Sequence, residues 1–127
     1  MSKNRQILFV CVENSSRSQM AEGFARAKGL SASSAGTFPA NHVNPLAVQA
    51  MEEEGINIFE SKPKLLTEEL IEKAQLVILT DATLQDRLPK NLRKKIGKKL
   101  VIWSIPDPQG QSGRAREYKR VDVTHDF

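Results

Sequence analysis

The chain has 127 residues, a formal net charge of +4, 39% hydrophobic and 27% charged residues, one cysteine and two histidines. A chain of this length forms one domain with its own core, and its composition excludes a disordered protein. One cysteine excludes an internal disulfide and a cysteine-rich zinc site. We therefore expect residues 1–127 to form a single domain that needs no metal or cofactor.

The first predicted elements are a strand, a polar loop and a helix. The apolar run from Ile7 to Val12 predicts the strand, and Met20, Phe24 and Ala27 recur at helical spacing after the loop. Six apolar residues are too few for a signal-peptide core or a membrane span, so we expect a cytoplasmic protein with no membrane partner.

The loop between strand and helix carries the predicted chemistry. Cys11 lies where the strand ends, and Arg17 follows just before the helix. Backbone N–H groups and the positive helix N-terminus favour an oxyanion there, and the guanidinium fork of Arg17 matches two of its oxygens. The same field favours a thiolate at Cys11, which is a nucleophile aimed at bound phosphorus.

Two further loop residues suit supporting roles. Asn14 tolerates a left-handed backbone, and Ser18 suits an N-cap whose hydroxyl also reaches the sulfur. The alternative is an inert buried Cys11, but the small polar residues between Cys11 and Arg17 would make a poor core.

The rest of the chain alternates between strand and helix signals. We first predict a strand and turn over Leu30–Thr37, then a helix opened by Asn44-Pro45 and ended by Gly55. A short helix capped by Thr67 and a buried strand over Gln75–Thr80 follow. The last predicted elements are a helix from about Ala82 into the basic run and a strand over Leu100–Trp103. This alternation predicts an α/β fold: a doubly wound sheet of four parallel strands with helices on both faces. Ligands of such sheets bind beyond the carboxyl ends of the strands, where Cys11 lies.

The basic run from Lys90 to Lys99 has six Lys or Arg in ten residues. One interpretation is attraction of nucleic acid or acidic substrates. The other, which we favour from the sequence, is a solvated helix end with lysines at the negative pole and Gly97 as its stop. We therefore expect no nucleic-acid partner.

A second chemical element follows the last strand, where Asp107 stands between two prolines. Cleavage of a phosphate ester by a thiolate needs an acid for the leaving oxygen and then a base for water, and Asp107 suits both roles. The alternative is a turn in which this carboxylate bonds to its own backbone.

These residues resemble the low-molecular-weight protein tyrosine phosphatase superfamily, which includes arsenate reductases coupled to thioredoxin or small thiols. The resemblance rests on the Cys-x5-Arg-Ser motif from Cys11 to Ser18, the small-residue turn from Ser34 to Thr37, and Asp107-Pro108. It implies Cys11 as nucleophile, Asp107 as acid and base, and Ser34 as a support for Asn14. It implies an anion-binding loop with Arg17 made of Val12, Glu13, Asn14, Ser15, Ser16 and Ser18.

Within the superfamily, the segments CVENS, VNPLAV, KPKLLTEEL and IPDPQG look more like the arsenate reductase branch. Reductases with an internal relay carry further cysteines after the third strand, where this chain has none between Thr80 and Asp86. Gln109 and Gly110 also replace the aromatic residues that tyrosine phosphatases usually place after Asp-Pro. The family's closing helix corresponds to Arg114–Arg120, and we expect either that it is shortened or that a partner supplies this element.

The sequence therefore supports three hypotheses. The first is a cysteine-dependent phosphomonoesterase that acts through a Cys11 thiophosphate on a substrate such as a phosphorylated protein. The alternative is an arsenate reductase that uses the same loop with an external thiol or redoxin. The third is a catalytically silent regulator that binds oxyanions.

Overall fold

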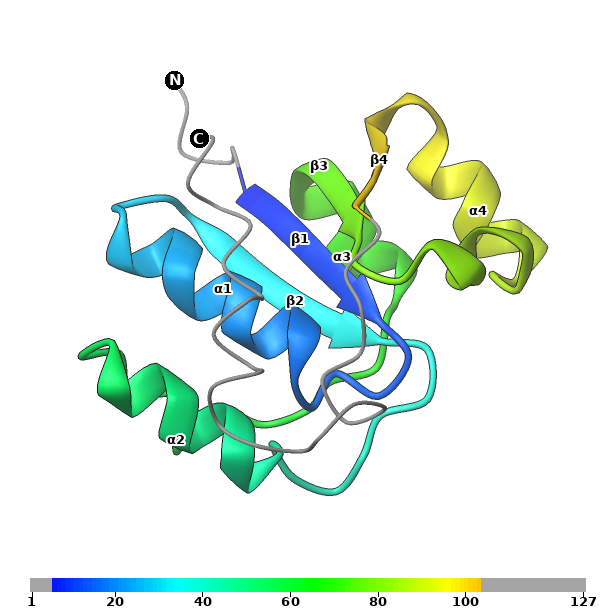
Figure 1. Ribbon diagram of the computed structural model, residues 1–127. Coiled ribbons are helices and arrows are strands. Elements are labelled where there is room, and N and C mark those ends of the chain that lie inside the picture. The colour runs from blue at the N-terminus through cyan, green and yellow to red at the C-terminus, as the bar shows by residue number, and fades with distance from the viewer. Residues whose placement is uncertain (1–5, 104–127) are drawn as a thin grey trace.

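The structure, a computed structural model, describes residues 6–103 and contains a four-stranded parallel sheet (Figure 1). The strands are β1 (Gln6–Cys11), β2 (Ala32–Gly36), β3 (Ala74–Leu79) and β4 (Leu100–Ile102), in the order β2-β1-β3-β4. All three strand pairs are parallel, and the central strand β1 ends at Cys11 opposite Gly36 of β2. The doubly wound sheet predicted from the sequence is confirmed.

Helices cover both faces of the sheet (Figure 1). The helical elements are α1 (Arg17–Ala27), α2 (Pro45–Glu53), α3 (Glu68–Lys73), the 3-10 turn η1 (Ala82–Asp86), α4 (Lys90–Ile96) and the 3-10 turn η2 (Gly97–Lys99). Alternating residues of β1 reach the two faces: Leu8 and Val10 pack in a cluster with α3 and α4, whereas Phe9 packs against α1. A further cluster joins α1 to α2 around Met20 and Met51.

Local signals set most helix ends as predicted. The Asn44 side chain accepts a hydrogen bond from the N–H of Leu46 ahead of Pro45, and Thr67 accepts one from Leu70. Gly29 and Gly55 follow α1 and α2 with positive φ. Among the described residues, no helix is long and apolar enough to cross a membrane.

Two expectations about helices were wrong. The single helix predicted from Ala82 is a 3-10 turn followed by α4, because Pro89 has no N–H to continue a helix and disfavours helical backbone at Leu88. Helix α1 also begins at Arg17, so Ser18 lies inside it, and Ser16 takes the N-cap position without a side-chain cap bond.

Candidate active site

The predicted anion loop, residues 12–16, joins the end of β1 to the start of α1. Hydrogen bonds from the neighbouring segment fix its shape: the N–H groups of Thr37, Phe38, Ala40 and Asn44 donate to the carbonyls of Cys11, Val12, Glu13 and Ser15 over 2.8–3.2 Å. The glycine at the end of β2 is required here. A Cβ on Gly36 would lie 2.5 Å from the Val12 carbonyl oxygen.

The Cys11 sulfur is buried among hydrogen-bond donors. Its Sγ lies 3.1 Å from the backbone nitrogen of Asn14 and 2.9 Å from the hydroxyl of Ser18. Because the Ser18 oxygen accepts a bond of 2.7 Å from the Asn14 amide, its own O–H is available for the sulfur. Two polar groups therefore lie within hydrogen-bond distance of the sulfur. The predicted contact between Ser18 and the sulfur is confirmed.

Asn14 adopts the left-handed backbone expected of it, with φ of 53°. Its side-chain oxygen accepts hydrogen bonds from the Gln19 amide at 3.1 Å and from the backbone N–H of Lys64 at 2.9 Å. Asn14 is completely buried. The bond from its amide nitrogen to Ser18 and the two bonds to its amide oxygen therefore satisfy both ends of the side chain, and the bond from Lys64 connects the loop to a distant segment.

Arg17 pairs with a carboxylate that the sequence analysis did not identify. Its guanidinium lies 3.3 Å from Asp81, which follows β3 at the same edge of the sheet, and both side chains are largely buried. Burial raises the pKa of the Asp81 carboxyl, but hydrogen bonds from Thr83 and the charge of Arg17 outweigh it and hold the pKa below its ordinary value.

A small cavity of about 160 Å³ opens at this point. It is lined by Cys11, Val12, Glu13, Ser15, Ser16, Arg17 and Asp81. The thiol and the guanidinium therefore share one cavity, as the sequence predicted. Within the loop, Ser15 and Ser16 are buried and Glu13 is exposed.

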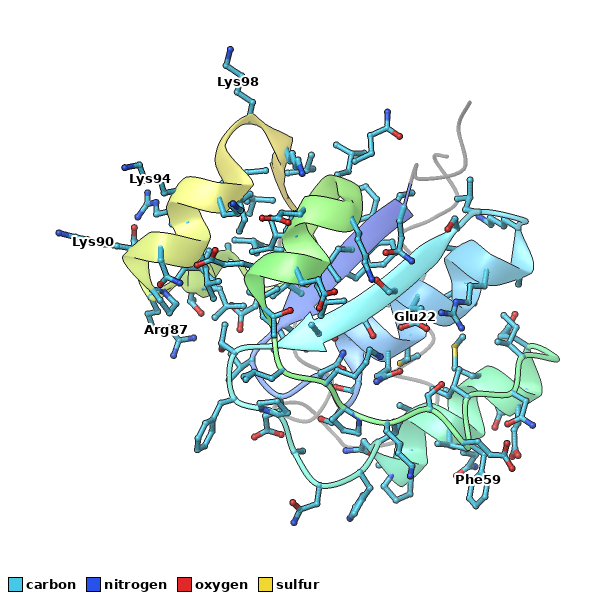
Figure 2. The ribbon with its side chains drawn as sticks, turned by 180° about the vertical axis from the view of Figure 1, so that it is seen from behind. Glu22, Phe59, Arg87, Lys90, Lys94 and Lys98 are labelled. Carbon is cyan, nitrogen blue, oxygen red and sulfur yellow. The ribbon has the colours of Figure 1, made fainter. Side chains whose placement is uncertain are left out.

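Ser34 does not support Asn14 as the family resemblance implied. Its hydroxyl donates to the carboxylate of Glu22 on α1, at 2.5 Å. Ser34 lies on β2, and Figure 2 shows Glu22 on the helix beside that strand. Glu22 also pairs with Arg26 at 3.0 Å. The residues that hold Asn14 are Ser18, Gln19 and Lys64 instead.

The contributions of Asp81, Gln19 and Lys64 were missed by sequence reasoning. Asp81 carried a usable signal, because it is a carboxylate directly after a buried strand. Lys64 carried none, since its contribution is a backbone N–H that any residue except proline supplies. Asp107 and Arg114–Arg120 lie outside the described residues.

Comparisons with known proteins cover most of the chain. Residues 6–122 match a family model described as low molecular weight phosphotyrosine protein phosphatase. The chain is 38% identical over 114 residues to an arsenate reductase of Halalkalibacterium halodurans, covering 87% of this chain and 79% of that protein. It is 36% identical over 123 residues to an arsenate reductase of Staphylococcus aureus strain Newman, covering 92% and 87%.

A solved structure is similar over the same extent. The low molecular weight protein tyrosine phosphatase from T. tengcongensis superposes with a TM-score of 0.78 at 28% identity. The match covers 92% of this chain and 89% of that one.

Proposed function

Because the chain belongs to the low molecular weight phosphotyrosine protein phosphatase family, we propose that it hydrolyses phosphate monoesters through a phosphorylated Cys11. The observation that carries this proposal is the setting of the sulfur. The Cys11 Sγ lies within hydrogen-bond distance of the Asn14 N–H and the Ser18 hydroxyl, and Cys11 lines the same cavity as Arg17. A nucleophile and an anion-binding group thus lie at one place.

In the first step, the Cys11 thiolate attacks phosphorus, a sulfur–phosphorus bond forms, and the bond from phosphorus to the ester oxygen breaks. Arg17 and the N–H groups of the loop Val12–Ser16 hold the equatorial oxygens. We assign Asp107 as the acid that protonates the leaving oxygen. In the second step, Asp107 takes a proton from water, water attacks phosphorus, and the Cys11 thiolate leaves with release of phosphate.

Arsenate reduction is the second candidate, and the curated relatives named arsenate reductase favour it. In this reaction the Cys11 sulfur attacks arsenic(V), and one arsenate oxygen leaves as water. An external thiol then attacks that sulfur to form a mixed disulfide, the sulfur–arsenic bond breaks, and arsenic leaves with its electron pair as arsenite. A second thiol then restores Cys11. The external thiol, a small thiol or a redoxin, is necessary because the chain has a single cysteine.

One comparison separates these functions. Wild type and Cys11→Ser are assayed for phosphate release from an aryl phosphate and, separately, for arsenite formation with glutathione or a thioredoxin system. Hydrolysis that depends on Cys11, with no arsenite, supports the phosphatase. Arsenite that requires both Cys11 and the added thiol assigns the protein to the reductases.

Two further outcomes are informative. Asp107→Ala should reduce turnover of the aryl phosphate while leaving binding of inorganic phosphate nearly unchanged, and full turnover in this variant contradicts the role of Asp107. Phosphate binding with no product under any condition contradicts both enzymes and leaves a silent oxyanion-binding regulator.

A further inference from the structure

The segment from Arg87 through α4 to η2 carries a dense positive charge that the proposed chemistry does not use. Residues 87–99 contain no acidic residue. Their cations are Arg87, Lys90, Arg93, Lys94, Lys95, Lys98 and Lys99. Figure 2 shows Lys90 and Lys94 projecting from the side of α4 that faces away from the sheet, with Arg87 just before the helix and Lys98 on η2 beyond its end. These four residues are here called the basic stripe.

Some cations of this segment have structural roles, and the stripe is distinct from them. Lys95 pairs with Glu72 at 2.8 Å, and the Nζ of Lys99 donates to the carbonyl of Ile71 at 2.9 Å, so both connect this segment to α3. Within residues 6–103, by contrast, no carboxylate pairs with Lys90 or Lys94.

The position of Lys90 opposes helix stability. Lys90 is the first residue of α4, whose first turn has no acidic residue, although the N-terminal pole of a helix disfavours cations. Lys94 lies four residues further on, where like charges repel each other. A solvated helix end explains lysines near Gly97, as the sequence analysis favoured, but it does not explain Lys90.

The stripe is linked through Thr83 to Asp81, one of the residues that line the Cys11 cavity. Arg87 donates to the Thr83 hydroxyl at 2.8 Å, and that hydroxyl donates to Asp81 at 2.6 Å. Asp81 in turn pairs with Arg17 inside the cavity. Two hydrogen bonds therefore connect the cavity residue Asp81 to Arg87, the stripe residue that precedes α4.

We propose that the basic stripe binds an acidic, extended segment of a polypeptide substrate whose phosphorylated residue occupies the Cys11 cavity, an inference that rests on the proposed phosphatase function. Helix positions four residues apart are separated by about 6 Å along the axis, and alternate residues of an extended chain by about 6.6 Å, so acidic residues at alternate positions face successive lysines. Residues 87–99 have no aromatic side chain for base stacking, which favours a polypeptide over single-stranded nucleic acid.

The test uses two phosphotyrosine peptides of equal length, one with glutamate and one with glutamine at four alternate positions beside the phosphotyrosine. The peptide pair is made in two versions, one with the four positions before the phosphotyrosine and one with them after it. The proteins are wild type, Lys90→Gln/Lys94→Gln, and the control Lys28→Gln/Gln49→Glu. The control changes the net charge equally, on exposed positions of the face covered by α1 and α2.

At low salt, wild type and the control should have a KM about fivefold lower for the glutamate peptide than for the glutamine peptide. Lys90→Gln/Lys94→Gln should lose this difference while hydrolysing a small aryl phosphate normally. A labelled, unphosphorylated glutamate peptide provides a second readout by fluorescence anisotropy. Its affinity should fall about fivefold in the stripe variant alone.

The binding readout does not require catalysis, so it separates failure of the stripe from failure of the phosphatase. Weaker peptide binding in the stripe variant supports the docking surface even where no phosphate is released. Equal KM and equal affinity across all three proteins overturn the proposal. Tighter, stripe-dependent binding of a single-stranded oligonucleotide of the same charge also overturns it in favour of a nucleic-acid partner.

Discussion

Asn14 combines a strained backbone with a fully engaged side chain. Its φ of 53° lies in the left-handed region, and its amide contacts Ser18, Gln19 and Lys64. The hydrogen bonds hold the loop in a conformation that an L-residue rarely adopts. The same residue also orients the Ser18 hydroxyl toward the Cys11 sulfur, so a fold-stabilising contact also organises the nucleophile.

Replacement of Asn14 should separate these contributions. Asn14→Gly and Asn14→Ala both remove the side-chain bonds, so we expect kcat/KM for an aryl phosphate to fall at least about tenfold in each. The free energy of unfolding, measured in urea, should fall by about 1–3 kcal/mol for glycine and by about 1 kcal/mol more for alanine, whose Cβ adds strain. Wild-type activity in Asn14→Gly would contradict a role for the side chain.

Asp81 should make stability depend on acid pH. Because its folded pKa lies below the ordinary value of 3.8, its contribution is present above that pH and is lost as pH falls through the folded pKa. The difference in free energy of unfolding between wild type and Asp81→Asn should be constant from pH 7 to about 4 and narrow below it. Asp86→Asn, which removes an exposed carboxylate of η1, controls for the loss of one negative charge.

At the scale of elements, the end of β2 presses against the anion loop. A Cβ on Gly36 would lie 2.5 Å from the Val12 carbonyl oxygen and 2.9 Å from the Asn14 nitrogen, and both are backbone atoms that cannot rotate away. The N–H and carbonyl of Gly36 also bond to Lys64 and Leu66. Strand β2 therefore shapes the loop even though it carries no group in the cavity.

Gly36→Ala should damage the site through this contact. We expect the free energy of unfolding to fall by about 1–3 kcal/mol and phosphate affinity to fall severalfold, because the loop must move. Gly55→Ala is the matched control, since its positive φ costs about 1 kcal/mol but its Cβ meets nothing within 4 Å. Calorimetric titration with inorganic phosphate measures the affinity. Equal phosphate affinity in both variants would contradict the role of Gly36.

The sequence predicted elements whose signals are local. The apolar run of β1, the Asn44-Pro45 start of α2 and the Thr67 cap of α3 each depend on neighbouring residues, and all were confirmed. The break at Pro89 also had a local signal, because proline lacks the backbone N–H that a continuing helix needs. Partners such as Asp81 depend on how strands pair, and residue spacing alone does not give that register.

At the scale of the whole molecule, Cys11 lies at the carboxyl edge of the sheet because it is the last residue of the inner strand β1. The neighbouring strand β3 delivers Asp81 to the same edge, and α1 delivers Arg17. The Cys11 cavity therefore exists only in the folded state. A ligand that binds only this state must stabilise the entire fold.

Inorganic phosphate should therefore raise the melting temperature. At one hundred times its Kd, the stabilisation is about 2.7 kcal/mol, or several degrees for a domain of this size. Cys11→Ser should retain the shift, whereas Arg17→Lys should lose most of it because an ammonium lacks the planar fork. The control is Arg93→Lys, which makes the same change at an exposed position on α4. An equal shift in Arg17→Lys would contradict the anion-binding role.

The bond from Lys64 to the Asn14 amide joins positions 50 residues apart, and it sets an order of events during folding. Helix α1 forms from near neighbours, whereas this contact requires closure of a long loop, which is slower. After dilution from urea, helical circular dichroism should return before phosphatase activity. If activity lags behind helix formation, the orientation of Cys11 is a late event of folding; simultaneous recovery of both signals would contradict this order.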